Sequence, residues 1–223
     1  MHVRQYLDRR TAKIMGNREI AVLSHLWNKA REWGYTDGEN PCRGVEKYSE
    51  KARGVYVSDD QFNAVLAHAD APLNDAMLLA YYTGQRLADV LKMRRSDIED
   101  GALWITQNKT TQRLAITIEG DLKAAIDGML NRQRTATGMH LVQTDTGRPL
   151  TYPMLRKRFD RAREASGVDF QFRDIRPKTA SDSGSLAEAQ ALLGHQSSNT
   201  TKRHYRHVER VKPIHKKSAP HAK

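Results

Sequence analysis

The sequence has a single cysteine, Cys42, and no long apolar run. One cysteine excludes an internal disulfide framework and a cysteine-rich metal site. No apolar stretch approaches the roughly 20 residues that a membrane-spanning helix needs. The first residues, MHVRQYLDRR, also lack the apolar core of a secretory signal. We therefore expect an intracellular, cytoplasmic protein with no membrane partner.

Glycine and proline are sparse as well, at 14 and 7 residues, which argues against a fibrous or disordered chain. Hydrophobic residues make up 39% of the sequence and charged residues 28%, an ordinary composition for a globular protein. A chain of 223 residues can bury one well-packed domain and a smaller module or part of one.

Acidic residues are fewer than basic ones: 26 Asp and Glu face 37 Lys and Arg, a formal net charge of +11 with a pI of about 9.8. This excess favours a polyanionic partner, because each phosphate that Lys or Arg neutralises releases condensed counterions. Residues 58–100 are more acidic than basic, whereas residues 201–223 are mostly basic or histidine. Ribosomal, membrane-surface and simply well-solvated proteins share such an excess, so charge indicates nucleic acid without establishing it.

Apolar residues recur at helical spacing over residues 17–33, where we expect Asn17 to cap the start of a helix and Gly34 to close its end. A shorter helix is expected before it, around residues 3–7. The turn-rich GYTDGENP and the charged EKYSEKARG form a polar link after it. These signals predict a domain boundary near residues 50–55.

The residues after the link combine helical periodicity with two β-branched stretches. Ser58 and Gln61 form a capping box that opens one helix, and Ser185 and Glu188 form another, whose helix ends at Gly194. The stretches 102–106 and 114–118 flank the polar QNKTTQR and predict a β-hairpin.

Further helices are expected around residues 72–82, 86–95, 122–130 and 154–162. Asn199 is expected to cap a last helix that runs through Tyr205. The predicted fold class is mainly α with a small antiparallel β-sheet (α+β).

Five fragments of this second module gain meaning as an ordered set: TGQRLADVL (83–91), QNKTTQR (107–113), FRDIRPKTASD (172–182), LLGHQS (192–197) and TTKRHYRHV (200–208). Each alone has an ordinary explanation, such as a surface charge, a helix cap or a packed tyrosine. Together and in this order they resemble the tyrosine recombinase (phage integrase) family. That family has a Thr-Gly-x-Arg helix start, a hairpin lysine, a His-x-x-Arg segment, Leu-Gly-His and a tyrosine about ten residues further on.

The resemblance covers nearly all of residues 55–210, which it identifies as the catalytic domain. Residues 1–52 are similar to the C-terminal part of the family's helical (SAM-like) core-binding domain, and residues 211–223 form a basic tail. The resemblance further implies that the chain begins inside the core-binding domain. Complete members carry more helices in front.

The resemblance also implies the role of each site residue. Tyr205 would be the nucleophile, and Arg86 and Arg176 would clamp the scissile phosphate. Lys109 would protonate the leaving oxygen and His195 would hydrogen-bond a phosphate oxygen, while Asp89 could orient a catalytic arginine. These residue types suit the chemistry, because phosphodiester transfer depends on positioning and on stabilising negative charge. The family needs no cofactor, metal or ATP.

Arg173 departs from the pattern, because the family usually places histidine there. Arginine stays protonated and cannot act as a general base, although it can bind phosphate as a catalytic residue. Pro177 is also unusual and is tolerable only in the first turn of a helix, where its missing N–H is not needed.

The leading interpretation is a site-specific DNA recombinase that integrates or excises a phage or mobile element. The resemblance implies double-stranded DNA as partner, a homo-tetramer on DNA and a monomer in solution. Phosphate contacts are expected from three lysines of the tail (Lys212, Lys216 and Lys217). The alternatives are a catalytically impaired DNA-binding remnant and, more distantly, a topoisomerase-like relaxing enzyme.

Overall fold

A computed structural model describes residues 2–50, 54–133, 136 and 138–202. Tyr205 and the tail with Lys212, Lys216 and Lys217 lie outside these residues. The chain divides into two compact units, Met1–Arg53 and Gly54–Lys223. No helix in the described part of the chain is both long enough and apolar enough to cross a membrane.

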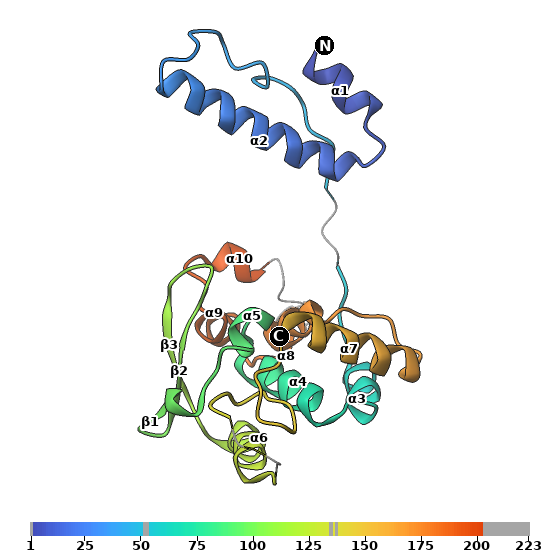
Figure 1. Ribbon diagram of the computed structural model, residues 1–223, viewed down its shortest axis with the longest axis vertical. Coiled ribbons are helices and arrows are strands. Elements are labelled where there is room, and N and C mark those ends of the chain that lie inside the picture. Colours follow the sequence, from blue (N-terminus) through green and yellow to red (C-terminus); the bar gives the residue numbers. More distant parts are fainter. Residues whose placement is uncertain (1, 51–53, 134–135, 137, 203–223) are drawn as a thin grey trace, which may run out of the picture. The chain divides into compact units, whose positions relative to one another are not determined.

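The first unit is built on two helices, α1 (Val3–Arg9) and α2 (Lys13–Glu32) (Figure 1). Its buried apolar residues are Val3, Leu7, Ile20 and Cys42, which come from both helices and from the segment that follows them. Burying them removes apolar surface from water, which stabilises this small unit.

The expected N-cap role of Asn17 is wrong, because α2 begins four residues earlier, at Lys13. Asn17 is only 4% exposed and bonds the backbone of Tyr48 twice. Its amide nitrogen donates to the Tyr48 carbonyl at 2.8 Å, and its side-chain oxygen accepts from the Tyr48 N–H at 2.9 Å. Asn17 therefore ties the segment at Tyr48 to the N-terminal part of α2.

The second unit is mostly helical with a small antiparallel sheet, which confirms the predicted fold class (Figure 1). At its centre lies α4 (Ala71–Thr83), which contacts α6 (Gly120–Asn131), α7 (Tyr152–Ser166) and α8 (Ile175–Asp182). Its other helical elements are α3 (Asp59–Ala67), α5 (Leu87–Val90), α9 (Leu186–Leu193), α10 (Ser198–Lys202) and the 3-10 turns η1 (Arg95–Asp97) and η2 (Phe172–Asp174).

The sheet consists of β1 (Ile98–Glu99), β2 (Ala102–Thr106) and β3 (Arg113–Thr117) in the order β1-β2-β3. The predicted hairpin is confirmed: β2 and β3 pair antiparallel, with Leu103 opposite Ile116 and Ile105 opposite Leu114. Leu103 and Ile105 are buried, so one face of β2 packs on the core of the second unit. Residues 107–112 form the turn of this hairpin.

Local signals placed most helix starts correctly. Ser58 and Gln61 form the expected reciprocal capping box at α3. Ser185 caps α9 by accepting from the Glu188 N–H at 3.1 Å. The helix α10 begins at Ser198, so the expected cap at the next residue, Asn199, is wrong.

The helix expected over residues 86–95 is wrong in its second half, because α5 ends at Val90. A turn at residues 91–92 follows α5, and Arg94 then forms an isolated β-bridge with His140. The Met93 carbonyl accepts from the Leu141 N–H and the Arg95 N–H donates to the Met139 carbonyl, both at 2.9 Å. These long-range hydrogen bonds use backbone groups that a longer helix would have paired internally, so the helix stops at Val90.

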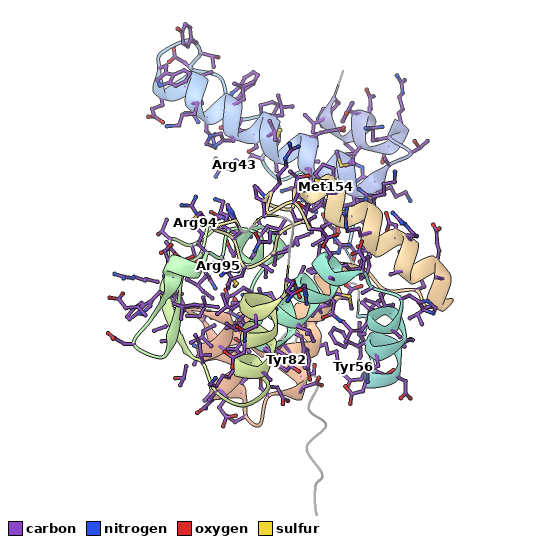
Figure 2. All side chains as sticks on the ribbon, turned by 60° about the horizontal axis from the view of Figure 1, so that its bottom comes forward. Arg43, Tyr56, Tyr82, Arg94, Arg95 and Met154 are labelled. Atoms are coloured by element: carbon purple, nitrogen blue, oxygen red, sulfur yellow. The ribbon has the colours of Figure 1, made fainter. Side chains whose placement is uncertain are left out.

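A buried lysine, Lys178, ties α8 to α3. Lys178 is 1% exposed and donates to Asp182 at 2.8 Å and to Asp59. The rings of Tyr81 and Tyr56, the latter labelled in Figure 2, lie 5.3 and 5.8 Å from the ammonium group. Burial alone would lower the pKa of Lys178, but the hydrogen bonds to Asp182 and Asp59 outweigh it and raise that pKa.

Lys178→Met should lower the free energy of unfolding by about 2 kcal/mol at neutral pH, because it removes the charged hydrogen bonds to Asp182 and Asp59. A raised pKa in the folded state contributes stability below the usual lysine value of 10.5, and this contribution is lost as pH rises through the folded pKa. The loss of stability caused by Lys178→Met should therefore shrink once the pH exceeds the raised pKa of Lys178 in the folded state. Urea unfolding at pH 7.5 and above pH 10.5 measures both effects.

Lys123→Met is the matched control. Lys123 and Asp127 have the same spacing along a helix and lie 2.5 Å apart, but both side chains are about half exposed. Such a pair contributes little to stability, so this variant should unfold like the unaltered chain. Equal behaviour of the two variants would show that the burial of Lys178 is unimportant.

Candidate active site

Five arginines line one cavity of about 690 Å³ in the second unit. They come from four separate segments, namely the start of α5, the length of α7, η2 and the first turn of α8 (Arg86, Arg156, Arg163, Arg173 and Arg176). Asp160 also lines the cavity and offsets part of their charge. A concave, strongly positive site is suited to an anion, and the planar guanidinium fork matches phosphate oxygens.

Arg176 is the most firmly held of these side chains. It donates through Nη1 to the Gly84 carbonyl and through Nη2 to the Leu193 carbonyl at 2.7 Å. Burial and, next, the positive charge of Arg86 lower the pKa of Arg176 to about 10, while Asp89 acts in the opposite direction. The site therefore holds a partly desolvated cation beside a second cation, and a bound anion would relieve both costs.

Arg86 and Arg173 complete the predicted arginine set at the same cavity. Arg86 is the N-cap residue of α5, and its Nη1 lies 3.4 Å from Oε1 of Gln107. Arg173 is exposed, in η2. Pro177 lies in the first turn of α8, the one place in a helix where a missing N–H is harmless.

His195 follows Gly194, the left-handed residue that ends α9. Its Nε2 lies 3.1 Å from Nη2 of Arg176, and its Nδ1 lies 2.9 Å from Oγ1 of Thr201. Arginine can only donate, so Nε2 is the acceptor and Nδ1 carries the proton of a neutral imidazole. The histidine thus joins Arg176 to α10.

Two further predicted residues are associated with the hairpin turn: Lys109 lies in it and Asp89 bonds it. Lys109 is exposed in that turn and is not among the residues that line the cavity. Asp89 is 3% exposed, and its Oδ1 accepts from the Asn108 N–H at 2.9 Å. The role of Asp89 in orienting an arginine stays a prediction, as do the catalytic roles of all these residues. Tyr205 lies outside the described residues.

Some site residues escaped the sequence-based reasoning. Arg156 and Arg163 stand seven residues apart on one face of α7, a spacing that could have marked them as a pair. Gln85 and Gln107 are buried at 1% and 0% exposure and bond each other at 2.7 Å. Both lie inside the quoted motifs, but glutamine has no fixed chemical role that would single it out.

Comparison with known proteins places these features in a family. The Phage integrase family matches residues 56–211. Prophage integrase IntE of Escherichia coli (strain K12) is 29% identical over 209 residues, which cover 83% of this chain and 55% of IntE. The integrase of Escherichia phage lambda is 33% identical over 191 residues, which cover 79% of this chain and 54% of that protein. The chain thus spans about half the length of these relatives.

Solved structures agree. A lambda integrase dimer bound to a COC′ core site matches with a TM-score of 0.76 and 26% identity, over 89% of this chain and 77% of that one. The lambda integrase catalytic core matches with a TM-score of 0.55 and 29% identity, over 63% of this chain and 91% of that one. Together with the match over residues 56–211, these findings show that the chain belongs to the phage integrase family.

Proposed function

We propose that the chain is a site-specific DNA recombinase, an integrase, that cleaves and rejoins double-stranded DNA through a 3′-phosphotyrosyl link to Tyr205. Its role is the integration or excision of a phage or mobile element. The family supports this reading, since its relatives are integrases of phages and a prophage.

One observation carries the proposal. Arg86, Arg176 and His195 come from segments separated by up to about a hundred residues, yet the two arginines line one cavity and His195 contacts Arg176 at 3.1 Å. Keeping two cations together at a partly desolvated site costs stability. A cost of this kind is characteristic of a functional site, and a phosphate diester is a ligand that would offset it.

The proposed chemistry balances without a cofactor. The phenol oxygen of Tyr205 loses its proton to solvent and attacks phosphorus, and the bond from phosphorus to the 5′ oxygen breaks. Lys109 gives a proton to that leaving oxygen, while Arg86 and Arg176 stabilise the charge on the non-bridging oxygens. The phosphotyrosyl link conserves the energy of the diester, so the reverse reaction rejoins the strand without ATP.

For His195, the proposed role requires a change of partner. Its Nε2 accepts from Arg176 in this structure and cannot donate to a phosphate in the same state. When Nη2 of Arg176 donates to a phosphate oxygen instead of to His195, Nε2 of His195 can take up a proton. His195 can then donate from Nε2 to another oxygen of the same phosphate. Thr201 can then accept from Nδ1 as it does here.

The proposed partner is double-stranded DNA at a recombination site, bound by a homo-tetramer that assembles on two sites from monomers in solution. The solved lambda integrase dimer bound to a COC′ core site supports assembly on a site. We further propose that residues 1–52 are the C-terminal part of a core-binding domain and residues 55–210 the catalytic domain. In this proposal Lys212, Lys216 and Lys217 add phosphate contacts.

The second candidate function is a catalytically impaired remnant that binds sites without completing strand exchange. Arg173 favours it, because this exposed cavity residue offers charge but no lone pair to accept the tyrosine proton. A suitable substrate separates the two candidates: duplexes selected from a random-sequence pool by covalent capture on the unaltered chain. Failure to capture any duplex would favour the remnant.

Tyr205→Phe should abolish the covalent adduct with a captured duplex while DNA binding stays within about threefold, since it removes the nucleophilic oxygen and little else. Denaturing gels detect the adduct, and fluorescence anisotropy measures binding. An adduct that persists in Tyr205→Phe would falsify the assignment of the nucleophile.

Arg86→Lys and Arg176→Lys keep the charge but lose the two-pronged guanidinium fork. Each should slow cleavage by roughly 100-fold or more at saturating DNA. Arg132→Lys is the control, because Arg132 bonds Asp75 elsewhere in the second unit. Near-normal single-turnover rates in either test variant would move the phosphate site elsewhere.

Cleavage by the unaltered chain should accelerate between pH 7 and pH 9, because solvent must deprotonate Tyr205 where Arg173 cannot. This range stays below the pKa of about 10 of Arg176, so the clamp keeps its charge throughout. Arg173→His should speed cleavage at pH 7 and flatten the profile. Slower cleavage at every pH would mean that arginine is adapted to this site and that the chain is not impaired.

A further inference from the structure

We propose that Gln107 is a positioning residue, which fixes the turn that carries Lys109 relative to Arg86 and so governs protonation of the leaving 5′ oxygen. This inference rests on the proposed phosphotyrosyl chemistry. It concerns a residue that lies two positions before Lys109 and does not line the arginine cavity.

The side-chain amide oxygen of Gln107 accepts hydrogen bonds both from the hairpin turn and from Arg86. Gln107 is fully buried at 0% exposure. Its Oε1 accepts from Oγ1 of Thr110 at 2.7 Å and from Nη1 of Arg86 at 3.4 Å. Thr110 directly follows Lys109, so the shorter bond holds the turn itself, and the longer bond holds the arginine more loosely.

The nitrogen of the same amide anchors Gln107 to the rest of the site. Nε2 donates to Oε1 of Gln85 at 2.7 Å and to the Leu193 carbonyl at 2.9 Å. The Leu193 carbonyl is also the acceptor for Arg176. One buried side chain therefore spans the hairpin turn, the residue before Arg86 and the end of α9 from which His195 emerges.

The backbone closes the turn around the same residue. The Gln107 N–H donates to the Gln112 carbonyl and the Gln107 carbonyl accepts from the Thr111 N–H, both at 2.9 Å. Asp89 then holds the next residue by accepting from the Asn108 N–H. The exposed Lys109 is thus flanked by residues whose positions are set from inside the unit, which limits the loss of freedom on reaching a substrate.

The close fit at Gly194 supports a specific placement of this amide. A Cβ atom added at Gly194 would lie 2.9 Å from Nε2 of Gln107, closer than real Cβ contacts. The side-chain amide of Gln107 therefore packs directly against the backbone at the end of α9, in space that a side chain at position 194 would occupy. Both amide atoms are fully bonded, so a shift of either segment would leave a buried polar group unsatisfied.

The test replaces the leaving oxygen with sulfur. A duplex from covalent capture is prepared with an ordinary phosphodiester or with a bridging 5′ sulfur at the scissile position. When the phosphorus–sulfur bond breaks, sulfur leaves as a thiolate, which is far less basic than an alkoxide and needs no proton. The sulfur substrate therefore rescues a defect in leaving-group protonation and does not rescue other defects.

Gln107→Met keeps the size of the side chain and removes its hydrogen bonds. On the ordinary duplex it should cleave about tenfold or more slowly than the unaltered chain, in the direction of Lys109→Ala. On the sulfur duplex both variants should come within about threefold of the unaltered chain. Arg86→Lys should stay slow on both substrates.

Gln143→Met is the matched control, because Gln143 is 1% exposed and bonds the Gly138 N–H away from the arginine cavity. It should cleave both duplexes like the unaltered chain. Thr110→Val covers the case in which Gln107→Met does not fold, because Thr110 is exposed and the change removes its bond to Gln107. It should show a smaller loss with the same sulfur rescue.

The outcomes are distinct. Equal slowing on both duplexes, or normal cleavage of the ordinary one by Gln107→Met, overturns the positioning role. If Gln107→Met does not fold, a Thr110→Val defect that sulfur leaves unchanged overturns it as well. If the unaltered chain forms no adduct with any duplex, the proposed function fails and this inference fails with it.

Discussion

The partly desolvated positive charge of Arg176 is the constraint around which the second unit is organised. Its guanidinium lies where water is scarce and where Arg86 adds a like charge, and its pKa falls accordingly. The groups that bond this guanidinium are neutral dipoles and not carboxylates. Two backbone carbonyls and one imidazole nitrogen surround the group, which keeps its charge available to a ligand.

Two residues further along α8, Lys178 shows the opposite solution to the same problem. It is buried more completely than Arg176, yet two carboxylates bond it and its pKa rises. One short helix thus carries a neutralised cation that holds it in place and an unneutralised cation that faces the cavity. The pKa of Lys178 is raised and that of Arg176 is lowered, a difference consistent with a stabilising role for Lys178 and with the proposed phosphate-binding role of Arg176.

The sequence predicted what local patterns encode and missed what long-range contacts decide. The hairpin and the Ser58 capping box follow from neighbouring residues. Three arginines of the cavity, Arg86, Arg173 and Arg176, were predicted because they lie in recognisable motifs, whereas its two arginines on α7 were not. The helix over residues 86–95 was overestimated because its second half pairs with residues near 140. Asn17 was assigned the wrong role, and Gln107 and Lys178 were missed, for a related reason. Each has a deciding partner tens of residues away (Tyr48, Leu193 and Asp59, respectively), and sequence spacing carries no signal for such contacts.

The carbonyls that receive Arg176 belong to the C-terminal ends of α4 and α9, where Gly84 and Gly194 adopt left-handed conformations. Main-chain acceptors cannot be removed by changing a side chain, so the orientation of this arginine is insulated from most point mutations. The orientation of Arg176 is instead sensitive to substitution of the two glycines themselves. A Cβ at Gly84 would lie 2.9 Å from Leu193, in addition to the strain of its positive φ. Substitution of a neighbouring side chain leaves both acceptors of Arg176 in place, whereas a change in the path of the backbone at either turn would displace them.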